Sequence, residues 1–327
     1  MAGAEAPVKT GAKAAVEPGM IWVPGGRFRM GSDAHYPDER PAHEVVVDGF
    51  WMDRTPVTNR RFRRFVEATG HVTLAERALD PAQYPGASKA DLAPGSLVFT
   101  PPAYRVTSHK DPLVWWRVAH GADWRHPLGP GSSIKGIEDH PVVHVGYADA
   151  EAYAAWAGKA LPTEAEWEFA ARGGLEDREF AWGDELTPGG RHMANTWQGE
   201  FPNQNLLEDR YARTSPVEAF PPNGYGLRDM IGNCWEWTAD WYVDGHADPG
   251  GHRACCAPRN PRGPSEEEAS VEPNAPNIRR KVLKGGSHLC APNYCRRYRP
   301  AARHAEAVDT STGHVSFRCV KRVPPEA

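Results

Sequence analysis

Residues 140–174, HPVVHVGYADAEAYAAWAGKALPTEAEWEFAARGG, carry the clearest structural signals in the chain. Thr163 and Glu166 have the spacing of a capping box, which predicts the first turn of a helix. Gly173 follows the apolar positions of this helix and predicts its end. A second helix is predicted just before it, over residues 149–157. The stretch therefore predicts two short helices in close succession.

Two histidines, His140 and His144, open the same stretch with the spacing of a metal-binding pair on a helix. Pro141 and the β-branched valines after it favour a strand instead. Side chains in a strand would not converge on one metal ion in this spacing. We interpret both residues as structural histidines.

Short elements are predicted upstream of this stretch. Residues 21–23 and 27–30 are short apolar or alternating segments around a Pro-Gly-Gly turn, which predicts a hairpin. Residues 43–48 predict another strand. A helix is predicted to begin after Thr58 and to end at Gly70.

The composition limits the class of fold. The chain has 327 residues, among them 32 Gly, 31 Pro and 12 Trp. So many Gly and Pro residues argue against a helix bundle or a long βαβ array. The helical pattern ends near residue 180, and residues 258–276 predict a long polar surface loop. We expect one irregular α+β domain over residues 20–322, a disordered lead over 1–19 and a tail over 323–327.

Charge and hydropathy point to a soluble protein. The net charge of −4 does not indicate a nucleic-acid partner. No apolar run is long enough to span a bilayer, and the first 20 residues lack the apolar core of a secretory signal. Six cysteines are too few for a disulfide scaffold. We therefore expect a cytoplasmic monomer without a membrane or nucleic-acid partner.

Reactive residues gather in residues 279–304, where Cys290 and Cys295 form a C-x4-C pair. This segment contains eight Lys or Arg residues and no Asp or Glu. A positive field favours thiolate over thiol, so the two cysteines are candidates for reactive groups or for ligands of Cu(I) or Zn(II). From the residues alone, small buried cysteines beside a solvated basic face remain an equal alternative.

Other classes of site have less support. A structural zinc site lacks a second metal-spaced pair, since Cys255 and Cys256 are directly adjacent. No C-x-x-C redox motif is present. The nucleophile elbow G-x-S-x-G, the Walker A loop and the dinucleotide fingerprint are also missing.

Six blocks of the sequence resemble the formylglycine-generating enzymes, also called sulfatase-modifying factors. They are residues 20–32, 55–62, 140–174, 195–202, 223–238 and 284–303. The blocks occur in order over nearly the whole chain. The early blocks are shared with a broader superfamily, whereas the C-x4-C block with its Gly-Gly-Ser lead and arginine-rich tail is specific.

The resemblance implies a variant of the C-type-lectin-like fold and a reaction. A cysteine in the C-x-P-x-R motif of a sulfatase would be oxidised to Cα-formylglycine with O2 and a thiol reductant. Cu(I) would lie between Cys290 and Cys295, with room for the substrate thiolate. Ser287 would position oxygen or substrate, and Trp235 would form a wall of the oxygen pocket. The basic segment would line a peptide groove, with three residues as substrate contacts: His288, Arg299 and Arg303.

Two structural calcium sites are also implied by the resemblance. The first set is Asn195, Thr196, Asp209 and Tyr211, and the second is Asp229, Gly232, Cys234 and Glu236. Thr196, Tyr211, Gly232 and Cys234 would bind through main-chain oxygens. Without the resemblance, the Asn and Asp residues would be read as ordinary turn caps.

The chain departs from the secreted members of this family at their two disulfides. The four corresponding positions are Ala154, Ala171, Pro300 and Cys319. Only one cysteine remains, so neither disulfide is expected, which fits a reducing compartment.

Two alternatives of other classes stay open. A lectin-like binding module without activity would be favoured by loss of either active-site cysteine, and both are present. An iron-dependent sulfoxide synthase would use an H-x3-H-x-E motif. Here Val145 and Gly146 follow His144, so the glutamate is missing.

Overall fold

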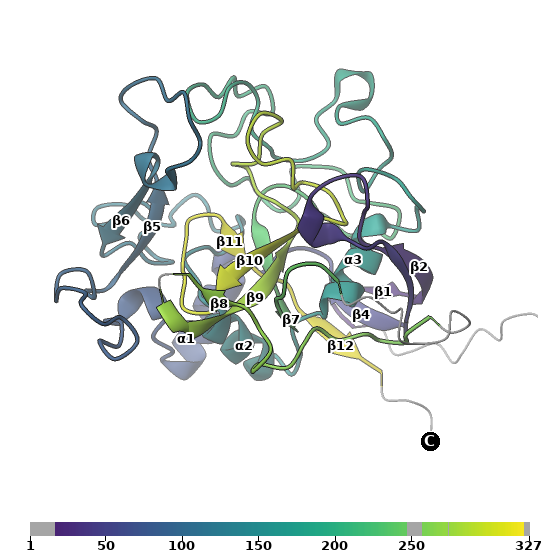
Figure 1. Ribbon diagram of the computed structural model, residues 1–327, viewed down its shortest axis with the longest axis horizontal. Helices are drawn as coiled ribbons and strands as arrows, with labels where there is room; N and C mark the ends of the chain where they lie inside the picture. Colours follow the sequence, from purple (N-terminus) through teal and green to yellow (C-terminus); the bar gives the residue numbers. More distant parts are fainter. Residues whose placement is uncertain (1–16, 247–256, 274, 324–327) are drawn as a thin grey trace, which may run out of the picture.

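The computed structural model describes residues 17–246, 257–273 and 275–323 (Figure 1). The lead and tail that the sequence predicts fall largely outside these ranges, as does the Cys255–Cys256 pair. No helix in the described parts of the chain is long and apolar enough to cross a membrane.

The predicted hairpin between residues 21–23 and 27–30 is wrong. The four strands that form in this region are β1 (Met20–Val23), β2 (Gly26–Met30), β3 (His43–Val47) and β4 (Phe50–Asp53). β1 pairs with β4, and β2 pairs with β3. Gly25, at φ +72°, lies so close to the β3–β4 connection that a Cβ there would be 2.5 Å from the carbonyl carbon of Asp48. The turn therefore packs against that connection and directs β1 and β2 into different sheets.

Two neighbouring strands of the central sheet hold the two ends of the loop that carries the cysteine pair. Its strands are β7 (Trp235–Trp241), β8 (Val271–Glu272), β9 (Ala275–Lys284), β10 (Arg303–Ala307) and β11 (Val315–Ser316), and β12 (Val320–Arg322) joins β4. Antiparallel pairing places Arg303 of β10 opposite Lys284 of β9. Residues 285–302 therefore form one long loop that leaves and re-enters the sheet at neighbouring positions, among the loops at the top of Figure 1.

The predicted helices form, with one shift. The helices are α1 (Asn59–Thr69), α2 (Tyr147–Trp156) and α3 (Glu164–Arg172). Thr58 accepts a hydrogen bond from the N–H of Arg61, and Thr163 and Glu166 form the predicted capping box. α2 begins two residues earlier than predicted. Gly70 follows α1 and Gly173 follows α3. Both glycines adopt the left-handed conformation, as is common at helix ends.

Residues 71–140, which show no periodicity, contain a hairpin and short turns. The hairpin consists of β5 (Gly95–Phe99) and β6 (Trp116–His120). Short 3-10 helices span Pro37–Glu39, Leu74–Glu76, Pro112–Val114 and Pro188–Gly190.

The segment around His140 and His144 is not the predicted strand, since only a single bridge joins Pro141 to Thr58. His144 is buried with φ +61°. Its ring nitrogens lie 2.7 Å from Ser96 Oγ and 2.9 Å from the Pro127 carbonyl oxygen. With both nitrogens occupied, His144 is a structural histidine, as predicted.

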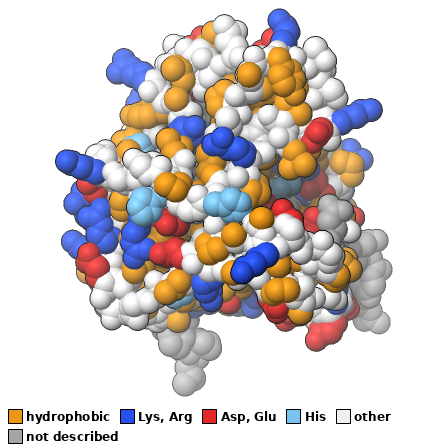
Figure 2. Space-filling view, turned by 90° about the vertical axis from the view of Figure 1, so that its left-hand side faces the viewer, with side chains coloured by type: hydrophobic (Ala, Val, Ile, Leu, Met, Phe, Trp, Pro, Cys, Tyr) orange, Lys and Arg blue, Asp and Glu red, His pale blue; other side chains and the backbone are white. Residues whose placement is uncertain are grey.

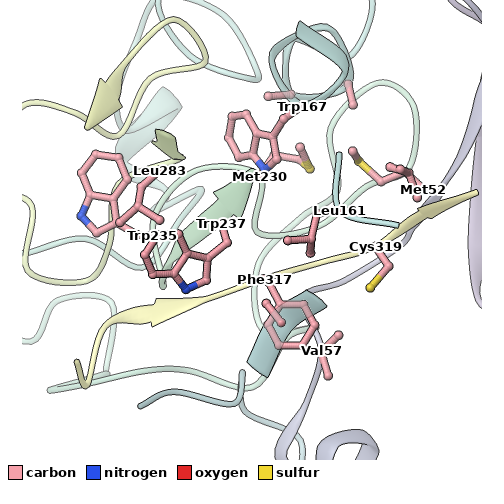
Figure 3. Close-up of a cluster of buried hydrophobic side chains, with 14 of the residues drawn as sticks. Met52, Val57, Leu161, Trp167, Met230, Trp235, Trp237, Leu283, Phe317 and Cys319 are labelled. Atoms are coloured by element: carbon pink, nitrogen blue, oxygen red, sulfur yellow. The ribbon is translucent and has the colours of Figure 1, made fainter. Parts of the chain in front are cut away.

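Tryptophans form much of the core. Figure 3 shows Trp167, Trp235 and Trp237 around Leu283 and Met230, where strands β7 and β9 meet helix α3. Cys319 lies in the same cluster as a free thiol. A second, smaller cluster lies between the β5–β6 hairpin and the cysteine loop: Phe99, Val106, Trp115, Trp197, Phe201, Leu289 and Ala291.

Candidate active site

Cys290 and Cys295 lie side by side in the loop between β9 and β10. Their Sγ atoms are 3.1 Å apart, and both residues are free cysteines. This separation exceeds the roughly 2.05 Å of a disulfide bond. Cys290 is only 2% exposed, whereas Cys295 is partly exposed. The pair therefore has a buried member and a member that another molecule can reach.

Two tight turns bring the thiols together. Cys290 donates its N–H to the Ser287 carbonyl oxygen at 2.9 Å, and the Ser287 N–H in turn points to Cys290 Sγ at 3.4 Å. Cys295 donates its N–H to the Ala291 carbonyl oxygen at 3.0 Å. The Ser287 hydroxyl is fully buried and accepts the Leu289 N–H at 3.2 Å. Ser287 is thus in direct contact with Cys290, and its predicted role in positioning oxygen or substrate remains a prediction.

Glycines before Ser287 allow the loop to close. Gly285 and Gly286 have φ values of +97° and +70°. A Cβ on Gly286 would lie 2.9 Å from the amide nitrogen of Tyr298, on the returning arm of the loop. The Gly-Gly-Ser sequence is therefore needed for both backbone conformation and close packing.

The two thiols differ in acidity. The hydrogen bond from the Cys290 thiol, together with the charges of Arg297 and Arg299, holds the pKa of Cys295 below its ordinary value, although burial opposes this. Burial and the neighbouring Cys295 raise the pKa of Cys290 well above its ordinary value. The arrangement favours a thiolate at Cys295 that accepts a hydrogen bond from a thiol at Cys290.

The strong positive field predicted for residues 279–304 is largely neutralised, which corrects the sequence-based expectation. Five of its cations pair with acidic residues from distant segments: Lys284 with Glu168, Arg296 with Glu179, Arg297 with Asp38, Arg299 with Glu39 and Arg303 with Glu164. Local sequence contains no trace of these partners. Most of the cations therefore hold the loop in place.

Arg299 and Arg303 are almost fully buried in ion pairs, and their predicted contact with substrate remains a prediction. They are 1% and 2% exposed. Arg299 forms two parallel hydrogen bonds with Glu39, at 2.9 and 2.5 Å. Arg303 binds Glu164 and the carbonyl oxygens of three further residues. Both act by positioning the backbone of the cysteine loop.

His288 is also held by the backbone. Its Nδ1 lies 2.8 Å from the Asn233 carbonyl oxygen, to which its own N–H also donates at 3.0 Å. Burial lowers the pKa of His288 to about 4, so the ring is neutral near pH 7. Its predicted contact with substrate remains a prediction.

Trp235 begins β7 and is buried in the same cluster as Cys290. Its ring stacks on His304, with centroids 5.4 Å apart. The predicted role of Trp235 beside an oxygen pocket remains a prediction.

An aromatic wall beside the cysteines escaped the sequence reasoning. Tyr294 precedes Cys295 and stacks on Phe201, with centroids 4.3 Å apart and an interplanar angle of 8°. Trp115 packs edge-on against both rings. Trp115 and Trp116 are adjacent tryptophans in a segment without periodicity, and only the tertiary structure places Trp115 here.

The first predicted calcium set contains buried oxygen atoms that are available as ligands. Asn195 Oδ1 and Asp209 Oδ2 are buried without a hydrogen-bond partner. Asn195 Nδ2 donates to the Arg213 carbonyl oxygen, so its oxygen faces the other way. Burial raises the pKa of Asp209, as expected for a carboxylate that lacks a cation. The Thr196 carbonyl oxygen accepts a hydrogen bond from Gln198, and Tyr211 donates its N–H to Asp209. The unsatisfied oxygens fit a hard cation.

The second predicted calcium set fits in part. Asp229 Oδ1 is buried without a partner, and burial raises the pKa of Asp229 to about 7. Gly232 and Cys234 are buried beside it. The Glu236 carboxylate, however, already binds Arg318 through both oxygens and Trp167 through one. Any role of Glu236 as a ligand would have to coexist with this ion pair.

Metal sites of other kinds have no support among the described residues. They contain no group of three or more His, Cys, Asp or Glu side chains arranged to hold a metal ion. His140 Nδ1 lies 3.0 Å from the Thr214 hydroxyl, and both ring nitrogens of His144 are occupied. These histidines therefore do not provide the iron site that a sulfoxide synthase would need.

Comparison with known proteins agrees with this geometry. Residues 6–323 match the family described as the sulfatase-modifying factor enzyme 1-like domain. The formylglycine-generating enzyme of Mycobacterium tuberculosis is 52% identical over 301 residues, which cover 92% of this chain and 97% of that protein. An inactive C-alpha-formylglycine-generating enzyme 2 from Bos taurus is 45% identical over 228 residues, covering 68% of this chain and 71% of that protein.

A solved structure supports the fold. PvdO from Pseudomonas aeruginosa is 25% identical with a TM-score of 0.55, and the match covers 94% of this chain and 100% of that one. The few helices, short strands and long loops agree with the predicted irregular α+β fold of C-type-lectin-like type. On the match over nearly its whole length, the chain belongs to the formylglycine-generating enzyme family, the sulfatase-modifying factors.

Proposed function

We propose that this protein is an oxidoreductase that converts the cysteine of a C-x-P-x-R segment in a sulfatase to Cα-formylglycine. The observation that carries the proposal is the pair of free thiols 3.1 Å apart, of which Cys295 can be reached from outside. The relative named formylglycine-generating enzyme supports the class of reaction.

The electron balance requires a second reductant. Conversion of the substrate cysteine side chain to an aldehyde, with release of hydrogen sulfide, removes two electrons from the substrate. Full reduction of O2, so that both oxygen atoms reach the oxidation level of water, requires four electrons. One oxygen becomes the aldehyde oxygen and the other leaves as water. Two thiol molecules supply the remaining two electrons and protons and leave as a disulfide.

The cysteine pair suits a soft metal ion. Two sulfur atoms at this separation, one of them already favoured as thiolate, are donors that Cu(I) prefers. Copper held there would supply one-electron chemistry with O2. The chain itself presents Cys295 toward the incoming thiol, keeps Cys290 buried and holds both through the turns at Ser287 and Ala291. The neutralised arginines fix the loop without competing for the substrate.

Calcium would have a structural role. The unsatisfied oxygens of Asn195, Asp209 and Asp229 would each gain a cation partner. The two segments touch, because the N–H of Asn233 donates to the Asn195 carbonyl oxygen at 2.8 Å. The Gly232 N–H also donates to the Gly285 carbonyl oxygen at 2.9 Å, at the base of the cysteine loop. Calcium in these segments would therefore stiffen the support of the active site.

The partner and compartment follow from the same features. A sulfatase segment would have to be extended or still unfolded for its cysteine to reach Cys295 inside the loop. All four described cysteines are free, which supports a reducing, cytoplasmic setting. We propose that the protein acts as a monomer without membrane or nucleic-acid partners.

A binding module of the same fold is the second candidate function. The relative from Bos taurus is named an inactive C-alpha-formylglycine-generating enzyme 2, which supports considering a member of this fold without activity. The retained thiol pair, with its lowered pKa at Cys295, favours catalysis here.

The test is mass spectrometry of a C-x-P-x-R peptide incubated with Cu(I)-loaded protein, O2 and a thiol. We expect loss of substrate thiol and gain of an aldehyde that reacts with a hydrazide. Cys290→Ser and Cys295→Ser should each abolish the product, whereas Cys319→Ala, in the core away from the loop, should retain it. Failure of metal-loaded wild-type protein to form the aldehyde would favour the binding module.

A further inference from the structure

Among the described residues, Arg213 is a partly buried arginine that lacks the acidic partner found for the most deeply buried arginines. Deeply buried guanidinium groups elsewhere face a carboxylate, as Arg172 faces Glu168 and Arg318 faces Glu236. Within the described ranges no acidic side chain pairs with Arg213, and its side chain makes a single hydrogen bond, from Nη2 to the Phe99 carbonyl oxygen at 3.3 Å. Burial is unfavourable for an unpaired charge, so an anionic ligand could stabilise the Arg213 guanidinium.

Arg213 lines a cavity of about 240 Å³ that is distinct from the cysteine loop. Most of the wall is apolar and comes from the β5 strand, the 127–137 segment and the turn at residue 141. The apolar lining residues are Val98, Pro127, Leu128, Ile134, Ile137, Pro141 and Val143. Leu128 is exposed and lies at the rim. The face that includes the β5–β6 side of the molecule shows hydrophobic side chains interspersed with Lys, Arg and His (Figure 2).

Polar residues also line this cavity, and several of them already have hydrogen-bond partners. Asn59 Oδ1 is buried without a donor, and Asn59 Nδ2 donates to the Ile137 carbonyl oxygen at 2.9 Å, which fixes the orientation of the amide. His140 uses Nδ1 to contact the Thr214 hydroxyl. His144 is saturated by its two contacts. The polar groups left for a ligand include the Arg213 guanidinium and the Asn59 amide oxygen, together with His140 Nε2 and the Ser133 hydroxyl.

We propose that this cavity binds a small organic carboxylate, with its anionic group on Arg213 and its apolar body against the Val98, Ile134 and Ile137 wall. Guanidinium binds carboxylates through two parallel hydrogen bonds, which Arg213 has donors left to make. An apolar cavity with a few convergent polar groups is the common form of a small-molecule site. The volume lies below the roughly 300–1,000 Å³ typical of drug-sized ligands, so a small molecule fits better than a peptide.

The site is independent of the proposed oxidation chemistry. Neither active-site cysteine lines the cavity. Binding can therefore be measured without substrate, copper or turnover, and failure of either proposal leaves the other untouched.

The experiment is calorimetric titration of the full chain, in calcium-containing buffer, with benzoate and with hexanoate as rigid and flexible probes. Their neutral amides, benzamide and hexanamide, are the matched ligands. We expect saturable binding of at least one carboxylate, with its amide about tenfold weaker or worse. Arg213→Gln should weaken carboxylate binding by a similar factor. Arg64→Gln removes the same charge from the exposed face of α1 and should leave binding unchanged.

A second variant keeps the test decisive if Arg213→Gln fails to fold. Ser133 is exposed and lines the cavity, so Ser133→Trp should obstruct it without disturbing the core. Loss of binding in this variant supports the assignment. The proposal is overturned if neither carboxylate binds saturably or if the amides bind as tightly as the carboxylates. It is also overturned if Ser133→Trp and, where it folds, Arg213→Gln bind the carboxylates with wild-type affinity.

Discussion

Glu39 and Arg299 form a two-pronged ion pair inside the protein, although they lie 260 positions apart in the sequence. Glu39 ends the short helix Pro37–Glu39, and Arg299 lies on the returning arm of the cysteine loop. Arg297 binds the neighbouring Asp38 and lies over the Tyr36 ring at 4.0 Å. The turn that contains Asp38 and Glu39 therefore binds the returning arm of the active-site loop and holds it in place.

Loss of this anchor should be costly. Glu39→Gln leaves the Arg299 guanidinium buried without a counter-charge, and the expected loss of unfolding free energy is about 3–5 kcal/mol. Urea unfolding followed by tryptophan fluorescence measures it. The double variant Glu39→Gln with Arg299→Met should recover part of the loss. Equal stability of wild type and the single variant would contradict the anchoring role.

Glu168 predicts a specific dependence of stability on pH. Burial alone would raise the pKa of Glu168, but Lys284 and Arg172 outweigh it and lower the pKa to about 2. A lowered folded-state pKa contributes stability that is complete above the unfolded value near 4.5 and is lost as the pH falls toward 2. From this shift, the contribution is on the order of 3 kcal/mol.

The measurement compares wild type with Glu168→Gln across pH. The wild-type advantage should be constant above pH 5 and should shrink progressively between pH 4.5 and 2, in line with the pKa values. Glu176→Gln makes the same substitution at an exposed residue and is the control for general acid effects. A constant difference between Glu168→Gln and wild type down to pH 2 would rule out the charge as its source.

Features encoded over a few residues could be predicted from the sequence. The capping box at Thr163 and Glu166 forms because each partner lies within one helical turn of the other. The ends of α1 follow from Thr58 and Gly70 for the same reason. The C-x4-C pair was also found, because a short loop must keep the two cysteines near each other.

Features that depend on distant segments could not be predicted. The Val23–Phe50 pairing that replaces the expected hairpin depends on how the turn at Gly25 packs against the β3–β4 connection. The burial of Arg299 likewise depends on Glu39, which no local pattern connects to it. A charge count over residues 279–304 includes only the residues of that segment. In the folded protein, acidic residues from distant segments pair with its cations.

Cysteine reactivity should follow exposure and acidity. In copper-free protein, iodoacetamide should modify Cys295 first, because it is partly exposed and its pKa is lowered. Cys290, Cys234 and Cys319 are buried with raised pKa values and should react slowly. Peptide mapping by mass spectrometry gives the order.

Two controls define this result. In denaturant all the thiols should react at similar rates. Cys290→Ala removes the hydrogen bond to Cys295 and should slow the reaction of Cys295 at neutral pH. Faster modification of Cys290 than of Cys295 in folded wild-type protein would contradict the assignment of the thiolate.

Calcium removal should destabilise the protein. A chelator should lower the melting temperature and added calcium should restore it, with a stabilisation of about 2.7 kcal/mol at a calcium concentration 100 times Kd. Asp209→Ala removes a carboxylate with an unsatisfied buried oxygen and should remove most of the response. Asp91→Asn, at an exposed turn, should keep it. An unchanged melting temperature in chelator would show that these oxygens hold no calcium.

Gly286 offers a test of how closely the active-site loop must pack. Gly286→Ala places a Cβ 2.9 Å from the Tyr298 amide nitrogen in a backbone at φ +70°. Gly70, at φ +68° after α1, has nearly the same φ but no atom within 4 Å of such a Cβ. Both variants carry the conformational cost of about 1 kcal/mol, and only Gly286→Ala also displaces the loop.

The two variants therefore separate strain from contact. Thermal unfolding should show a modest loss for Gly70→Ala and a larger one for Gly286→Ala. Peptide oxidation should persist in Gly70→Ala and fall sharply in Gly286→Ala, because the arm from Arg297 to Tyr298 would shift and carry Cys295 away from Cys290. If Gly286→Ala keeps full activity with the stability of Gly70→Ala, the loop tolerates the extra carbon and the spacing of the thiols does not depend on this contact.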